Sequence, residues 1–253
     1  MDLRLSRRVG IKLAVGVLAA ASTAIMPTAT AVPSNIAGMV VFIDPGHNGS
    51  NDGSINRQVP TGRGGTKDCQ TSGTATNSGY MEHTFTWDTA LRVRAELNAL
   101  GVRTALSRAN DNGPGPCVDE RANAANALHP NAVLSIHADG GPPSGRGFHV
   151  NYSAPPLNQV QAGPSVQYAR IMRDQMQASG IPPANYIGQN GLYGRSDLTG
   201  LNLAQYPSIL VECGNMKNPA DSALTESAEG RQKYADALVR GVAGFLASQG
   251  QAR

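Results

Sequence analysis

Three short apolar segments, each ending in a residue that can bind a metal ion or move a proton, constrain this chain most. The segments and the residues that follow them are Met39–Ile43 before Asp44-Pro-Gly-His47, Ala132–Ile136 before His137, and Ser208–Val211 before Glu212. Each has the length and the β-branched content of a buried strand. In open α/β sheets, ligands bind in the crevice outside the carboxyl ends of the strands. The sequence therefore predicts that His47, His137 and Glu212 meet at one edge of a sheet.

Helical and extended patterns alternate along the rest of the chain. Helices are expected over residues 82–100, 119–128, 163–178 and 227–247, and further strands over 102–106 and 147–152. This alternation indicates one α/β domain with a largely parallel, twisted sheet and helices on both faces. A Gly-, Asn-, Thr- and Ser-rich stretch over 48–79 interrupts the pattern. A loop of this length inside a compact domain is usually functional or mobile.

Residues 1–31 have the organisation of a secretory signal peptide. A basic start with Arg4, Arg7, Arg8 and Lys12 precedes an apolar run over 13–25 and an A-x-A cleavage site at Ala29-Thr-Ala31. The apolar run is short for a membrane span, which disfavours the alternative of an uncleaved anchor. We expect export to the periplasm, the cell wall or the medium, and no membrane attachment after cleavage.

The formal net charge of +3 comes from this leader. Residues 32–253 hold 17 basic and 17 acidic side chains. A balanced charge gives no reason to propose nucleic acid or a membrane surface as a partner.

The chain has three cysteines, an odd number for an exported protein. Cys69 and Cys117 lie in polar loops that contain Gly or Pro, whereas Cys213 follows the segment that ends in Glu212. We expect a Cys69–Cys117 disulfide and a free, buried Cys213. Sequence alone does not fix the connectivity, so the absence of any disulfide stays the alternative.

The chemistry that these residue types suggest is that of catalytic zinc. Such sites take three protein ligands and keep a fourth position for water, and a nearby carboxylate moves the proton. His47, His137, Glu212 and the helix-starting Glu82 supply the groups. Asp44 and Asp139 lie close to the two histidines in the sequence, and either could accept a hydrogen bond from an imidazole.

These motifs carry a resemblance to a known family. They are Asp44-Pro-Gly-His47-Asn-Gly, Glu82 before a helix, Leu106-Ser-Arg108, Arg121 with Asn126, Ser135-Ile-His137-Ala, and Leu210-Val-Glu212-Cys-Gly. In order and spacing the chain resembles the zinc-dependent N-acetylmuramoyl-L-alanine amidases of the type 3 family. With its leader and its Cys69/Cys117 pair it is similar to the minimal mycobacterial or actinobacterial members, which have no separate wall-binding module.

The resemblance implies a role for each site residue. His47, Glu82 and His137 would bind Zn²⁺, and Glu212 would be the catalytic carboxylate. The implied reaction is hydrolysis of the amide between N-acetylmuramic acid and the L-alanine of the stem peptide, in peptidoglycan or muropeptides. Separately from the resemblance, we expect the catalytic domain to span 32–253 and to be a monomer. His83 stays an alternative to Glu82 as ligand, and an ion-paired structural role stays an alternative for Glu212.

Arg195 matches a family arginine and is a candidate to bind a substrate carboxylate, because guanidinium groups pair bidentately with carboxylates. A solvated surface arginine is the alternative. Two other functions also stay open for the whole chain. One is a zinc exopeptidase of the carboxypeptidase type, although the chain has Ser50 where the His-x-x-Glu pair of such enzymes needs a glutamate. The other is a non-catalytic wall-binding or zinc-sequestering protein.

Overall fold

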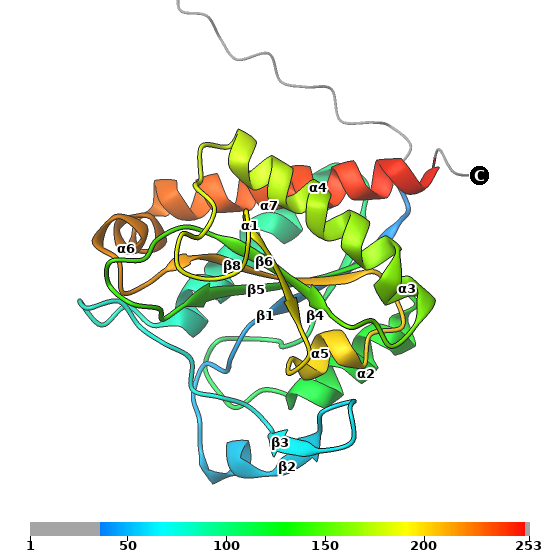
Figure 1. The fold of residues 1–253 in the computed structure, drawn as a ribbon, viewed down its shortest axis with the longest axis horizontal. Helices are drawn as coiled ribbons and strands as arrows, with labels where there is room; N and C mark the ends of the chain where they lie inside the picture. Colours follow the sequence, from blue (N-terminus) through cyan, green and yellow to red (C-terminus); the bar gives the residue numbers. More distant parts are fainter. Residues whose placement is uncertain (1–35, 251–253) are drawn as a thin grey trace, which may run out of the picture. The chain divides into compact units, whose positions relative to one another are not determined.

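A six-stranded mixed sheet forms the centre of the structure, a computed structural model that describes residues 36–250 (Figure 1). The strands, in their spatial order, are β4 (Arg103–Leu106), β1 (Val40–Pro45), β5 (Ala132–Asp139), β8 (Ser208–Asn215), β6 (His149–Ser153) and β7 (Leu192–Arg195). The first four are mutually parallel, β6 pairs antiparallel with β8, and β7 pairs parallel with β6. The prediction of a largely parallel sheet is confirmed.

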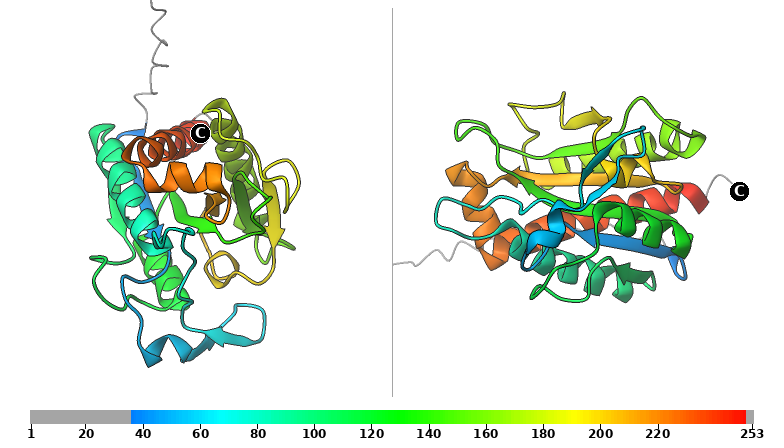
Figure 2. Two further views of the ribbon diagram at one scale, coloured as in Figure 1. Left: turned by 90° about the vertical axis from the view of Figure 1, so that its left-hand side faces the viewer. Right: turned by 90° about the horizontal axis from the view of Figure 1, so that it is seen from below.

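Helices cover both faces of this sheet, as predicted (Figures 1 and 2). They are α1 (Glu82–Ala99), α2 (Val118–Leu128), α3 (Gln159–Ala162), α4 (Pro164–Ala178), α5 (Thr199–Asn202), α6 (Pro219–Glu226) and α7 (Ala228–Gly250). The long helices α1, α4 and α7 pack together over one face, and α2 and α5 lie over the other. Within residues 36–250, no helix is both long and apolar enough to cross a membrane.

The alternation of side chains along each strand divides the core from the site. Val41 and Ile43 of β1 are fully buried in the large apolar core that also includes residues of α1, α4 and α7. Because successive side chains of a strand point to opposite faces, Phe42 and Asp44 face α2 instead. The same alternation places Ser135 with His137 on β5 and Leu210 with Glu212 on β8. The polar ends of the strands therefore share the face opposite the core helices.

The stretch expected to be one long loop has structure of its own. A short 3-10 helix (Gly53–Asn56) precedes an antiparallel hairpin of β2 (Gln58–Pro60) and β3 (Thr66–Asp68). Directly after the hairpin, Cys69 forms the predicted disulfide with Cys117, the residue before α2. Cys213 is free and buried, as predicted. The predicted signal peptide, 1–31, lies outside the described residues.

Candidate metal centre

His47, Glu82 and His137 converge where the sheet meets the start of α1. One donor atom from each lies within 4.8 Å of the other two. Nε2 of His47 is 3.0 Å from Oε2 of Glu82 and 3.2 Å from Nδ1 of His137, and that Nδ1 is 3.1 Å from Oε1 of Glu82. His47 and Glu82 are buried, and the side chain of His137 is 16% exposed. The three predicted ligands thus form one cluster that is reachable from its His137 side.

His47 is held by the segment that follows the disulfide. Its Nδ1 lies 2.9 Å from the carbonyl oxygen of Thr71 and donates to it, which leaves the Nε2 lone pair facing Glu82 and His137. Hydrogen bonding of the second ring nitrogen to a carbonyl fixes the tautomer of a metal-binding histidine. A main-chain carbonyl has no residue-type signature, so no sequence pattern could have identified this partner.

Two backbone amides orient the carboxylate of Glu82. Oε2 accepts from the N–H of Thr74 at 2.9 Å, and Oε1 accepts from the N–H of Ala138 at 3.0 Å. Glu82 also donates its own N–H to the carbonyl of Thr74. The carboxylate is therefore fixed before any cation arrives, between the strand that carries His137 and the segment that contacts His47.

The electrostatics of the cluster favour an ionised Glu82 and a proton on His47. Burial alone would raise the pKa of Glu82, but the adjacent His47 and His137 outweigh it and hold that pKa well below its ordinary value. Burial opposes a proton on His47, yet the Glu82 carboxylate outweighs this and raises the pKa of His47. A cation that binds here would take the place of the proton on His47.

Glu212 lies beside the cluster without joining it. It pairs in register with His137 on β5 and with His149 on β6. Its Oε2 is buried and has no hydrogen-bond partner among the described residues. Burial raises the pKa of Glu212 well above its ordinary value, and the charges of Glu82 and Asp139 raise it further. No ion pair with Glu212 is present in the described part of the chain, so the alternative of an ion-paired structural carboxylate has no support.

The expectation that Asp44 or Asp139 accepts a hydrogen bond from a histidine is wrong. Asp44 accepts from Arg121 at 2.9 Å and from the hydroxyls of Ser107 and Ser135 at 2.6 and 2.7 Å. Asp139 accepts from the hydroxyl of Tyr186 at 2.9 Å and from the N–H of Gly140. Each carboxylate is occupied by donors that come from other parts of the fold.

Two further predicted candidates lie outside the cluster. His83, the alternative to Glu82, turns its Nδ1 to Asp111 at 2.9 Å. Arg195 forms a bidentate pair with Asp197, at 2.7 and 2.5 Å, and lies over the ring of Tyr193. Its charge lowers the pKa of Glu212 against the effect of burial, so it acts on the site electrostatically without contacting the cluster.

His149, which belongs to no sequence motif, is a buried ionisable residue next to Glu212. It is 1% exposed, its Nδ1 has no hydrogen-bond partner among residues 36–250, and its ring packs edge-on to Tyr186 and Tyr193. Burial lowers its pKa to about 4. The imidazole of His149 is therefore uncharged at neutral pH and adds no positive charge beside Glu212.

A cavity of about 140 Å³ opens next to the two histidines, between the sheet, α2 and α5. Its walls are largely apolar, with Phe42, Val133 and Leu201 among them. The cavity adds an apolar surface on the side of the cluster that faces away from the core helices.

The donor set fits zinc. Two imidazole nitrogens and one carboxylate oxygen are ligands that catalytic zinc sites use, and three protein donors leave one position open. On one side of the site, Thr71 and Thr74 form hydrogen bonds with His47 and Glu82. Zinc ligands in other proteins make outer contacts of this kind.

Comparison with known proteins identifies the family of this chain. The profile of the N-acetylmuramoyl-L-alanine amidase family matches residues 41–244. The N-acetylmuramoyl-L-alanine amidase Rv3717 of Mycobacterium tuberculosis is 83% identical over 239 residues, which cover 94% of this chain and 99% of that protein.

Solved structures give the same result. The amidase Ami1 of Mycobacterium smegmatis superposes with a TM-score of 0.85 at 76% identity, covering 85% of this chain and all of that one. Ami1 of Mycobacterium abscessus gives 0.83 at 64% identity, with 83% and 100% covered. Sequence profile, relatives and fold coincide over the region that carries the cluster, and the chain belongs to the N-acetylmuramoyl-L-alanine amidase family.

Proposed function

We propose that this member of the amidase family is a peptidoglycan hydrolase that cleaves the amide between N-acetylmuramic acid and L-alanine with Zn²⁺ bound to His47, Glu82 and His137. One observation carries the proposal. Three donors, two of them buried, form a cluster, and Glu212, which is not a member of the cluster, pairs in register with its His137.

The cluster defines what a bound ion contributes. His47, Glu82 and His137 would hold the ion, and a zinc ion there would supply a Lewis acid for the carbonyl group and lower the pKa of water towards neutrality. The hydrogen bond from His47 to the carbonyl of Thr71 and those from the amides of Thr74 and Ala138 to Glu82 support this role, because they keep the ligand atoms turned inwards.

Glu212 moves the proton. Acting as general base, it takes a proton from the attacking water as the oxygen bonds to the amide carbon. It then delivers that proton to the nitrogen of L-alanine as the carbon–nitrogen bond breaks. A carboxyl group with a raised pKa suits both steps, since it must accept and then release the same proton.

Arg195 is the proposed contact for a carboxylate of the stem peptide. Its guanidinium already pairs with Asp197, so a substrate carboxylate would share or displace that partner. The location of Arg195 on β7, across from Ser153 of β6, supports a role at the edge of the substrate site.

The domain over 32–253 is proposed to act outside the cytoplasm, sent there by the leader over 1–31. The disulfide between Cys69 and Cys117 supports this location, because disulfides persist in oxidising compartments. A monomer is proposed. In its support, only four large apolar side chains are exposed within 36–250, and no two of them are adjacent in the sequence: Met81, Leu91, Leu128 and Leu157.

Product analysis tests this function. Purified peptidoglycan and muramyl dipeptide are incubated with the protein, and the products are identified by mass spectrometry. The expected product is stem peptide with a free N-terminal L-alanine. Release of C-terminal amino acids would instead indicate an exopeptidase, and zinc binding without any hydrolysis would indicate a binding protein.

A further inference from the structure

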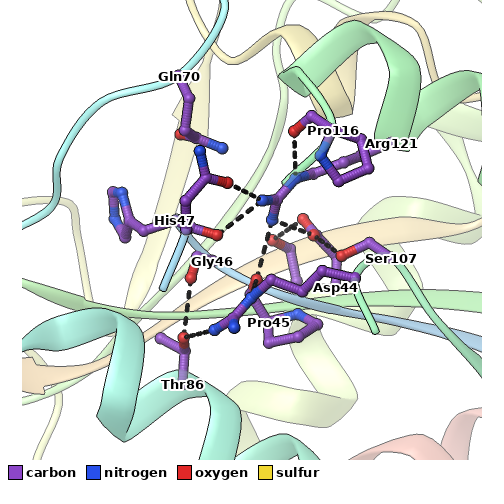
Figure 3. Close-up of polar contacts among 12 residues, drawn as sticks. Asp44, Pro45, Gly46, His47, Gln70, Thr86, Ser107, Pro116 and Arg121 are labelled. Carbon is purple, nitrogen blue, oxygen red and sulfur yellow. Dashed lines mark hydrogen bonds and ion pairs between the residues drawn. The ribbon is translucent and has the colours of Figure 1, made fainter. Parts of the chain in front are cut away.

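A single arginine of α2, Arg121, ties together the turn that carries the ligand His47 (Figure 3). Each of its five N–H groups has an acceptor. These are the carbonyls of Pro116, Pro45 and His47 at 2.9, 2.9 and 2.6 Å, and side-chain oxygens of Asp44 and Asn48 at 2.9 Å each. Four of the five acceptors belong to the continuous segment 44–48. Arg121 therefore clamps the whole turn from one side.

Other side chains hold the same turn from the opposite side. Thr86 of α1 donates its hydroxyl to the carbonyl of Gly46 at 2.9 Å, and Arg108 donates to the carbonyl of Pro45 at 3.2 Å. Three successive carbonyls, those of residues 45 to 47, thus have side-chain donors from α1, from α2 and from the loop that follows β4. Side chains that are far apart in the sequence determine the path of this turn.

The turn needs this support because of the backbone at His47. Its φ is +62°, in the left-handed region that non-glycine residues adopt uncommonly. Such conformations persist where the surrounding structure over-determines them. Here the conformation sends the carbonyl of His47 to Arg121 while the ring turns to Thr71, Glu82 and His137.

Arg121 is not available for substrate. It is 4% exposed, all its donors are used, and its charge is paired with Asp44. A substrate anion would have to break these contacts to reach it. Its contribution is therefore made through the groups that it already holds.

We propose that Arg121 is a positioning residue for the metal centre: it holds the Asp44–Asn48 turn so that His47 presents Nε2 to the cation without reorganisation. The proposal rests on the proposed function, because it takes the cluster to be a zinc site. It assigns no contact between Arg121 and zinc or substrate.

Arg121→Lys tests the proposal. Lysine keeps the charge but places three donors on one nitrogen, which cannot reach five spread acceptors. Zinc affinity, measured by competition with a chromophoric chelator, is expected to fall about 10- to 100-fold, the usual loss when an outer contact of a ligand is removed. The visible spectrum of the cobalt(II)-substituted variant should change as well, because the donor set around the ion loses its fixed geometry.

Arg231→Lys is the matched control. Like Arg121, Arg231 on α7 is largely buried and pairs with an aspartate, here Asp88. It also donates to the carbonyls of Thr225 and Glu226, and none of these three partners belongs to the cluster. This variant is expected to lower stability and to leave zinc affinity unchanged. It separates an effect on the metal site from the general cost of replacing a buried arginine.

A second pair of variants keeps the proposal testable if Arg121→Lys does not fold. Thr86→Val removes the hydroxyl that holds Gly46 but keeps the side-chain shape, and Thr86→Ser keeps the hydroxyl. If side-chain donors are needed to hold the turn, zinc binding should be weaker in Thr86→Val and near normal in Thr86→Ser.

The outcomes distinguish the positioning role of Arg121 from the zinc-dependent amidase function. A folded Arg121→Lys protein with the zinc affinity and cobalt spectrum of the unaltered protein overturns the positioning role and leaves the amidase function intact. Equal zinc affinity in Thr86→Val and Thr86→Ser also counts against it. Absence of zinc binding in the unaltered protein contradicts the metal centre itself, and with it both proposals.

Discussion

Glu212 stands directly opposite His137, one strand away, in the register of the parallel strands β5 and β8. Directly paired residues on neighbouring strands point to the same face, so the carboxylate faces the same side as the imidazole. The register shifts immediately afterwards, between His137 and Asp139. The last regular pair of these two strands is therefore the pair that joins the metal cluster to the proposed general base.

Glu212→Gln is expected to retain zinc and to lose activity. The amide has nearly the shape of the carboxyl group but cannot accept and return a proton, so kcat should fall by about 10²- to 10⁴-fold. Zinc content after dialysis and steady-state rates on muramyl dipeptide measure the two effects. His137→Ala, the comparison variant, should lose both zinc and activity. Normal turnover by Glu212→Gln would remove Glu212 from its assigned role.

Gly73→Ala is expected to damage the metal centre. At Gly73, where φ is +79°, a Cβ atom would lie 2.9 Å from Cγ of His47 and 3.0 Å from Oε2 of Glu82. Both ligands would have to move, and zinc affinity should fall by about tenfold or more.

Gly79→Ala is the control for Gly73→Ala. Gly79 also has a positive φ, +94°, but a Cβ atom there would meet nothing within 4 Å. Its substitution should cost only the backbone strain, about 1 kcal/mol of unfolding free energy, and should leave zinc binding as it is. Equal zinc affinity in the two variants would show that the segment around Gly73 does not support the ligands.

The lowered pKa of Asp44 predicts how the stability of the folded protein depends on pH. Burial alone would raise its pKa, but Arg121 and the hydroxyls of Ser107 and Ser135 outweigh it and lower the pKa from 3.8 to about 2. The stabilisation, about 2 kcal/mol, is complete above the unfolded-state pKa and is lost as the pH falls through the folded-state value. Asp44→Asn should therefore be less stable than the unaltered protein at neutral pH.

Urea unfolding of both proteins at a series of pH values checks this. The difference between them is expected to be constant down to about pH 4 and to shrink below it. A difference that does not change between about pH 5 and pH 3 would contradict the role of an ionised Asp44.

Removal of the disulfide should weaken the fold. Cys69 and Cys117 are 48 residues apart, and closing a loop of this size in the unfolded chain is worth about 2–4 kcal/mol. Thermal unfolding with and without reductant measures the effect, and Cys213→Ala, which removes the free thiol, should shift on reduction by as much as the unaltered protein does. An unfolding temperature that does not respond to reductant would show that the bridge does not constrain the folded chain.

The sequence was sufficient for the features that are local. His137 and Glu212 follow apolar strands directly, and Glu82 starts a helix, so strand ends and a helix start already predict their meeting point. The sequence also favours pairing Cys69 with Cys117, because both lie in polar loops. The short helix α6 (Pro219–Glu226) was missed, although Asn218 as its N-cap and Pro219 at its first position are signals of a helix start.

The contacts that hold the ligands could not be predicted. His47 relies on the carbonyl of Thr71, and a carbonyl is present in every residue. Asp44 was expected to accept from a histidine, but Arg121 lies 77 positions away in the sequence and offers a full positive charge, which binds a carboxylate more strongly than a neutral imidazole does. Which donor reaches Asp44 depends on the tertiary structure, and the spacing of residues in the sequence does not show it.

The most direct test of the account removes the metal and returns it. The protein is stripped with a chelator, zinc is added back in increments, and release of L-alanine-terminated peptide from muramyl dipeptide is followed by mass spectrometry. A zinc-dependent amidase with one metal centre should show no hydrolysis after stripping, and its recovery should saturate at a single zinc ion per chain. Full activity in protein shown to be free of metal would contradict this dependence on zinc.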